Sequence, residues 1–249
     1  MKMFIVCFLL FSCVVAEAAS VQINDGNIFY ENEGTTKQIT SSGRDDGAKL
    51  HPGGEWIYFI RDVEGKWVGE KYYPPEGLKI KDDILKQELW RVKNDGTGAK
   101  MLFRSERAAI DGPDPDYTIA TVENIQFSPS GDKVYFETSQ WVTSAALHVM
   151  NADGTHEKLL GGGNATKIIL STTDYAGEHN KFKGYIVTNQ HRYWQFGGSY
   201  DWYWLYTPNF KEVGPLGDDF AYFTQMRDMK YTDQSENEAR VSKYVLPSK

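Results

Sequence analysis

A turn-and-strand pattern recurs along this chain, and its period constrains the fold more than any other feature. The clearest copy lies in residues 127–155, where the turn FSPSG (127–131) precedes the strand VYF (134–136). A second strand, LHVM (147–150), ends in the turn NADG (151–154). Proline presets φ in the first turn, glycine accepts φ > 0 in both, and the first strand is β-branched and aromatic. Each copy is therefore expected to contain a β-hairpin.

Counterparts of this pattern occur throughout the sequence. ENEGT (31–35), KNDGT (93–97) and, more loosely, YTPNF (206–210) correspond to the second turn, and HPGGEWIYF (51–59) matches SPSGDKVYF (128–136) in character. The second-turn copies start at residues 31, 93, 151 and 206, which gives steps of 62, 58 and 55 residues. Repeats of this length, built from four short strands, predict propeller blades rather than a helical solenoid.

The repeats predict an all-β fold, a small β-propeller with four or five blades of antiparallel strands. Complete blades are expected at residues 46–104, 120–161 and 165–216. Two strands within 27–40 and two within 219–247, at 220–224 and 240–246, are expected to share a further blade. Strands from both termini would then close the ring and remove its free sheet edges.

The repeated sequence resembles the β-propeller repeat of TolB-type proteins, which is a WD40-like repeat. SPSGDKVYF (128–136) and LHVMNADGTHEKLL (147–160) are close to that family's usual S-P-D-G-x-x-I-x-F and I-Y-V-M-N-x-D-G-x-x-x-x-x-L-T. The match is strongest in 120–160 and poor after residue 165. The resemblance implies a propeller fold and a protein partner in the cell envelope, without the separate N-terminal domain typical of TolB. It specifies fold better than function, because such repeats occur in binding proteins, peptidase propellers and sugar-processing enzymes.

The first 18 residues have the pattern of a secretory signal peptide. Lys2 supplies the positive start, residues 3–15 the apolar run, and AEA (16–18) a small-x-small cleavage signal. The alternatives are a single transmembrane anchor, for which the apolar run is short, and a lipid anchor on Cys13. We expect a periplasmic or secreted protein with no membrane span after signal removal.

Composition narrows the class of the mature chain, which is expected to be one propeller domain over residues 19–249. Both cysteines, Cys7 and Cys13, lie in the signal segment, so the mature chain has no thiol and depends on a packed core. The net charge is −7 and no basic stripe occurs. This argues against nucleic acid as the main partner.

Two insertions interrupt the repeat and are candidate binding loops. The insertion at 66–87 carries Tyr72 and Tyr73 beside two prolines. The insertion at 107–124 holds three carboxylates within six residues, namely Asp111, Asp114 and Asp116. These carboxylates are a weak candidate calcium site, because the glycine and final glutamate of an EF-hand are missing. A solvated acidic loop is the stronger alternative, and no other cofactor is expected.

The densest aromatic run is QHRYWQFGGSYDWYWLY (190–206). A strand buried on one face needs large residues only at alternate positions, whereas both faces are aromatic here. Exposed rings beside polar groups would suit sugar stacking or a protein hot spot, and the alternative is a sheet buried on both faces between blades. The candidate binding residues of this run are Arg192, Tyr193, Trp194, Tyr200, Asp201 and Trp202.

No catalytic signature accompanies the repeats. No histidine pair has zinc spacing and no G-x-S-x-G motif occurs, so no catalytic residue is assigned. We predict a non-enzymatic binding module for a protein partner. The alternative is a carbohydrate-active enzyme (lyase or glycosidase) or a sugar-binding propeller. An enzyme of this kind needs converging carboxylates or an acid–base pair with a metal, for example Asp201 with Glu123 or Glu178.

Overall fold

The computed structural model describes residues 18–63, 86–105, 119, 121–139, 144–170, 182–193 and 199–217. All regular elements within these ranges are β-strands, which confirms the predicted all-β class. In the same ranges no helix is long and apolar enough to cross a membrane. The strands are β1 (Ser20–Asn24), β2 (Asn27–Asn32), β3 (Thr35–Gln38), β4 (Asp45–Leu50), β5 (Trp56–Val63), β6 (Lys86–Lys93), β7 (Lys100–Arg104), β8 (Glu123–Phe127), β9 (Lys133–Ser139), β10 (Ala145–Asn151), β11 (Lys158–Gly162), β12 (Asn164–Ile168), β13 (Ile186–Tyr193), β14 (Ser199–Tyr206) and β15 (Glu212–Gly217).

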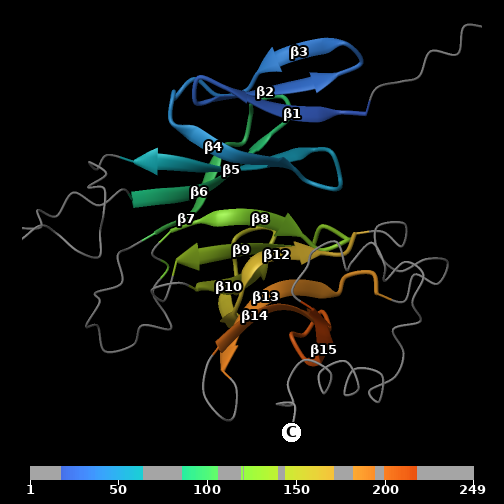
Figure 1. Ribbon diagram of the computed structural model, residues 1–249. Coiled ribbons are helices and arrows are strands. Elements are labelled where there is room, and N and C mark those ends of the chain that lie inside the picture. The colour runs from blue at the N-terminus through green and yellow to red at the C-terminus, as the bar shows by residue number, and fades with distance from the viewer. Residues whose placement is uncertain are drawn as a thin grey trace, which may run out of the picture.

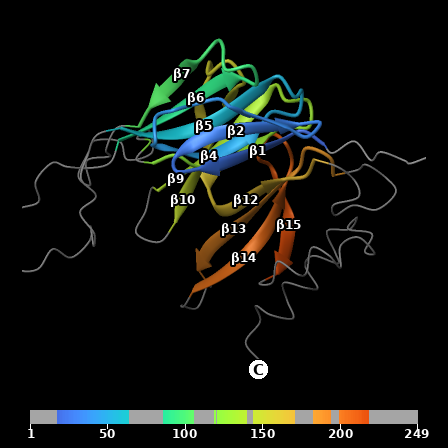
Figure 2. The ribbon, with the colours of Figure 1, turned by 90° about the horizontal axis from the view of Figure 1, so that it is seen from above.

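These strands form four antiparallel sheets in chain order. β1–β3 make a three-stranded sheet, and β4–β7, β8–β11 and β12–β15 make four-stranded sheets in which consecutive strands are hydrogen-bonded neighbours. We call the sheets blades 1 to 4, and the interface between two successive blades a seam. Figure 1 shows the blades stacked in chain order, from blue blade 1 to orange blade 4, and Figure 2 shows them from above. The sheets are therefore arranged as propeller blades.

The three complete blades agree with their predicted positions. Blade 2 spans residues 45–104, blade 3 spans 123–162 and blade 4 spans 164–217, so each predicted boundary lies within three residues of the observed one. Glycines produce the turns that set this spacing. Gly54 and Gly131, between the first two strands of blades 2 and 3, have φ values of 76° and 78°.

Blade 1 differs from the prediction. Three strands, not two, come from the N-terminal part of the chain, because β1 (Ser20–Asn24) precedes the expected pair. A four-stranded blade would thus need one more strand instead of two. The predicted closing segments, 220–224 and 240–246, lie outside the described residues, so ring closure stays a prediction.

The first strand of each complete blade contains the same irregularity. β4, β8 and β12 are neighbours across the seams, and each has two unpaired residues where its register shifts against the next strand: residues 47–48, 124–125 and 165–166. The residue at the shift has positive φ in all three strands: 59° at Gly47, 48° at Asn124 and 49° at Ala165. The bulge is thus part of the repeat, although only one of these residues is glycine.

The hydrophobic core lies in the seams, because the middle strands are buried on both faces. On β5, Ile57 and Phe59 pack toward blade 1, whereas Tyr58 and Ile60 pack toward blade 3. The alternation of side chains along a strand produces this two-sided burial. Full burial of one such large side chain stabilises the fold by roughly 1.5–3 kcal/mol.

Candidate functional site

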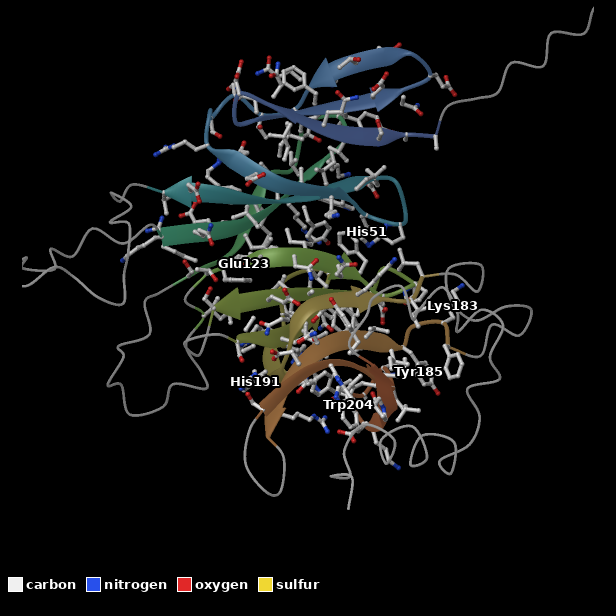
Figure 3. All side chains as sticks on the ribbon, in the orientation of Figure 1. His51, Glu123, Lys183, Tyr185, His191 and Trp204 are labelled. Carbon is white, nitrogen blue, oxygen red and sulfur yellow. The ribbon has the colours of Figure 1, made fainter. Side chains whose placement is uncertain are left out.

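A cleft of about 870 Å³ lies at the seam between blades 3 and 4. Turns at 128–132, 183–184 and 208–209 border it, and strands β9 to β11 contribute its remaining wall. Figure 3 shows Lys183, which lines the cleft, on the same side of the molecule as His51 and opposite Glu123 and His191. The lining residues are Ser128, Pro129, Ser130, Asp132, Lys133, Tyr135, Val149, Met150, His156, Lys158, Leu160, Lys183, Gly184, Pro208 and Asn209.

The preceding seam, between blades 2 and 3, is bridged at the corresponding place. The hydroxyl of Tyr58 donates to the carbonyl oxygen of Ala152 at 2.6 Å, and Nη1 of Arg91 donates to the same oxygen at 2.9 Å. Nε2 of His51 lies 2.8 Å from the carbonyl oxygen of Gly131. The Arg91 guanidinium also lies 4.5 Å from the ring centroid of Trp56. Long polar and aromatic side chains thus span this seam.

Strand register identifies the equivalent positions in blade 3. Trp56, the first residue of β5, pairs with Lys93, the last residue of β6. In the same way Lys133, the first residue of β9, pairs with Asn151, the last residue of β10. Two residues further along, Tyr58 pairs with Arg91 and Tyr135 pairs with Val149. The equivalences that follow are His51 with Ser128, Trp56 with Lys133, Tyr58 with Tyr135, and Arg91 with Val149.

The cleft follows from these replacements. Ser128 and Val149 are too short to reach blade 4 in the way that His51 and Arg91 reach blade 3. Tyr135 keeps the aromatic ring that Tyr58 supplies in blade 2. Unlike the hydroxyl of Tyr58, its hydroxyl has no hydrogen-bond acceptor among the described residues. Burial raises the pKa of the Tyr135 hydroxyl, which therefore stays protonated at neutral pH and can donate a hydrogen bond.

The cleft is positively charged although the chain is acidic. Three lysines and one aspartate line it, so its charge is 3 − 1 = +2 with His156 neutral, against −7 for the whole sequence. Hydrogen bonds from Ser128 and then Ser130 hold the pKa of Asp132 below its usual range, although burial opposes this shift. Asp132 is therefore ionised at neutral pH and already engaged by the two hydroxyls.

The lysines of the cleft differ in how firmly they are held. Nζ of Lys133 donates to Oδ1 of Asn151 at 2.6 Å. Lys158 lies in the last strand of blade 3. Its equivalents are Lys37 in the last strand of blade 1 and Lys100 in the last strand of blade 2. Those two donate across a seam, Lys37 to the carbonyl oxygen of Asp95 at 2.8 Å and Lys100 to that of Asp153 at 3.2 Å.

Lys158 and Lys183 make no such bond within the part of the chain that the structure describes. Both are exposed at the cleft, and none of the recorded ion pairs or hydrogen bonds includes their ammonium groups. An unengaged ammonium group in a cleft is available to an anionic ligand.

Arg192, a predicted binding residue, is held within blade 4. Nη2 of Arg192 donates to the Tyr206 hydroxyl at 2.8 Å and to Oε2 of Glu212 at 2.6 Å. Its guanidinium carbon lies 3.5 Å from the ring centroid of Trp204. Burial would lower the pKa of Arg192, but the bond to Glu212 and the nearby Tyr206 raise it. These contacts tie β13 to β14 and β15.

The aromatic run of β14 is divided between two faces. Trp202, Trp204 and Tyr206 pack in the seam with blade 3, whereas Tyr203 and Leu205 belong to a cluster on the other face of blade 4. Trp202, a predicted binding residue, is only 8% exposed. The described rings therefore fit the alternative interpretation, a sheet buried on both faces. Asp201 is exposed, with Oδ1 2.8 Å from Nδ1 of His191.

The other predicted site residues cannot be placed. The residues that lie outside the described ranges, or in β13 and β14 with undescribed side chains, are Tyr72, Tyr73, Asp111, Asp114, Asp116, Tyr193, Trp194 and Tyr200. The strand ends that flank their segments belong to the rim opposite the cleft, because β5–β6, β7–β8 and β13–β14 connect at the same end of these meanders.

The carboxylates proposed for an enzyme are not brought together where they are described. Oε1 of Glu123 accepts hydrogen bonds from Thr121 at 3.0 Å and Ser139 at 3.2 Å, Asp201 pairs with His191, and Glu178 lies outside the described residues. Among the residues placed by the structure, no group of three His, Cys, Asp or Glu side chains could hold a metal ion. Among the described residues that line the cleft, the single carboxylate is that of Asp132.

Sequence reasoning missed the cleft and its lysines. The available signal was the departure of one copy from another, since Trp56 and Arg91 in blade 2 become Lys133 and Val149 in blade 3. Gly53 N donates to Nδ1 of His51 at 3.0 Å within the turn, and no sequence signal indicated the contact of His51 with Gly131 across the seam.

Comparisons with known proteins identify solved structures only. No protein-family model matches the chain, and no curated protein matches it. A TolB-type protein from Agrobacterium tumefaciens is 22% identical, with 58% of this chain and 44% of that one covered and a TM-score of 0.35. TolB from Acinetobacter baumannii is 10% identical, with 78% and 38% covered and a TM-score of 0.44.

An oligogalacturonate lyase from Vibrio parahaemolyticus is also similar, at 7% identity and a TM-score of 0.41, with 80% of this chain and 62% of that one covered. The chain spans 38% to 62% of the length of these three structures. At such low similarity, the residues of the cleft must be interpreted from their own chemistry.

Proposed function

We propose that this protein is an exported, TolB-like β-propeller that binds a protein partner in the cell envelope without a covalent step. The cleft between blades 3 and 4 carries the proposal, since it combines two lysines without partners among the described residues, a hydrogen-bond donor and apolar surface in one concave site. Such a combination is typical of recognition sites. The rigid blades hold these groups in place before a partner arrives, which lowers the entropic cost of binding.

The chemistry of the cleft favours binding over catalysis. Hydrolysis of a glycosidic bond ordinarily uses two carboxylates that flank the scissile bond. The described lining of the cleft offers one carboxylate, Asp132, whose pKa is lowered by Ser128 and Ser130, so it is a poor proton donor at neutral pH. Lys158 and Lys183 can neutralise a partner's charge without any proton transfer.

The location in the envelope rests on the sequence. Residues 1–18 have the charge, apolar run and small residues of a signal peptide, and the repeats resemble those of TolB-type proteins. We expect N-terminal sequencing of the protein from a periplasmic fraction to give a chain that starts at residue 19.

Site-specific photo-crosslinking in the native host tests the role of the cleft. A photoreactive residue replaces Lys158 in one variant and Lys86, which is exposed at the start of β6 on the opposite rim, in the control. We expect one envelope protein to be crosslinked at position 158 and not at position 86. Crosslinking of that protein at position 86 alone, or of no envelope protein at either position, would overturn the proposal.

A further inference from the structure

We infer that the cleft selects an acidic peptide segment of the partner, with a carboxylate bound by Lys158 and Lys183 and a neighbouring apolar side chain on the cleft wall. This inference rests on the proposed function and specifies the ligand of the same site. Three independent features of the cleft support it: its charge, its unused hydrogen-bond donor and its apolar lining.

The positive charge of the cleft favours a ligand with negative charge. Lys37 and Lys100 show what this lysine does elsewhere in the repeat, because each donates to a turn carbonyl of the next blade. Lys158 lacks that bond in the described structure and lines the cleft with Lys183. Two ammonium groups that have no partner among the described residues, in a protein of net charge −7, favour an anionic group.

The donor of the cleft suits a polypeptide backbone. At the seam between blades 2 and 3, the Tyr58 hydroxyl donates to a main-chain carbonyl, that of Ala152. Tyr135 occupies the equivalent place, and its hydroxyl reaches no acceptor among the described residues. A backbone carbonyl of the ligand would take the position that Ala152 takes one seam earlier.

The apolar lining separates a peptide from other anions. Leu160, Pro129 and Pro208 form the accessible apolar lining of the cleft, over the buried side chains of Val149 and Met150. This surface would gain from covering an aliphatic side chain, which inorganic anions and acidic sugars lack. Stacking of sugar rings ordinarily uses exposed aromatic faces, whereas Tyr135, the one aromatic residue among the described lining residues, is only 4% exposed.

Fluorescence anisotropy with defined ligands tests the inference on the mature, full-length chain. The probe is a labelled decapeptide in which aspartate and glutamate alternate with leucine, and its counterpart carries lysine in place of each acidic residue. We expect saturable binding of the acidic probe only, weakened about tenfold or more between low salt and 0.3 M salt. A labelled oligomer of uronic acids is the second ligand.

Charge reversal locates the binding site. The double variant Lys158→Glu/Lys183→Glu should bind the acidic probe at least tenfold more weakly, whereas Lys86→Glu should bind it as the parent does. Lys158, Lys183 and Lys86 are all exposed, so the circular dichroism spectra of both variants are expected to match that of the parent. Filling the cleft with the blade 2 residues, in Lys133→Trp/Val149→Arg, should also abolish binding of the probe.

The outcomes separate this inference from the proposed function. Equal binding of the acidic and basic probes, equal binding by the parent and the charge-reversed variant, or preference for the uronic acid oligomer would overturn the acidic-peptide inference. If an envelope protein still crosslinked at position 158 in those cases, binding through the cleft would stand. Absence of that crosslink would instead remove the proposed function itself.

Discussion

The bridged seam between blades 2 and 3 predicts a coupling free energy that can be measured. Two donors share the carbonyl oxygen of Ala152, the Tyr58 hydroxyl at 2.6 Å and Nη1 of Arg91 at 2.9 Å. In either single variant, Tyr58→Phe or Arg91→Met, the oxygen keeps one donor. In the double variant it loses both, so the cost should exceed the sum of the two single costs.

The structure sets the magnitudes. Tyr58→Phe removes one hydrogen bond and should cost about 1 kcal/mol of unfolding free energy. Arg91→Met removes one hydrogen bond and the contact with the Trp56 ring at 4.5 Å, which together should cost about 1–2 kcal/mol. The carbonyl left without donors adds about 1 kcal/mol in the double variant, which should therefore lose about 3–4 kcal/mol.

Urea unfolding at 25 °C, followed by circular dichroism, measures all three variants against the parent. Tyr135→Phe is the matched control, because the Tyr135 hydroxyl has no acceptor among the described residues, and it should change stability by less than about 0.5 kcal/mol. Additivity of the two single costs within about 0.3 kcal/mol, or a cost of Tyr135→Phe equal to that of Tyr58→Phe, would refute the reasoning.

Three further predictions concern single residues. Burial raises the pKa of Glu137, although Thr166 donates to it at 2.5 Å. The stability linked to this carboxyl is present below its unfolded pKa of about 4.3 and is lost as pH rises through the higher folded pKa. Glu137→Gln should thus exceed the parent in unfolding free energy at about pH 7 and equal it near pH 4; an equal gain at both pH values would contradict the cause. Ala165 has a φ of 49°, a conformation that glycine adopts more readily than alanine. Ala165→Gly should therefore stabilise the fold by about 0.5–1 kcal/mol and raise the thermal midpoint. An unchanged or lower midpoint would exclude strain at this residue. Gly131→Ala should destabilise more than Gly34→Ala in the same unfolding assay, because both have positive φ but only at Gly131 would a Cβ lie 2.4 Å from the His51 ring; equal losses would mean that His51 moves freely.

The blades could be predicted because their signals are local. Turn sequences such as SPSG at 128–131 place glycine at a positive φ, and the strands between them are short and apolar. Each blade boundary could therefore be counted from one turn to the next. β1 was missed because its five residues, SVQIN, include few apolar side chains and follow directly after the signal segment.

The bulges and the cleft could not be predicted in the same way. Asn124 and Ala165 adopt positive φ because each first strand repeats the irregularity that glycine allows at Gly47, and no local signal marks alanine for this role. The cleft depends on contacts between residues far apart in sequence, such as His51 with Gly131 and Tyr58 with Ala152. Only alignment of one blade against the next indicates where those contacts are lost.

Residues 201–205 of the aromatic run were placed correctly on a strand, but the exposure of their rings could not be predicted. Alternation along β14 sends Trp202 and Trp204 into one seam and Tyr203 to the opposite face, so a sheet with two covered faces buries these three described rings. Sequence alone cannot tell a covered face from an open one, because both can carry aromatic side chains.

Lysine footprinting by mass spectrometry tests the central claim most directly, namely that the unbridged seam is the binding site. The rate of lysine acylation would be measured in the free protein and with the acidic peptide bound. Lys37 and Lys100, whose ammonium groups are hydrogen-bonded across seams, serve as internal references. We predict that Lys158 and Lys183 react faster than both references and that, of these four lysines, the peptide protects Lys158 and Lys183 alone. Equal rates at all four lysines, or protection that spares Lys158 and Lys183, would contradict the claim.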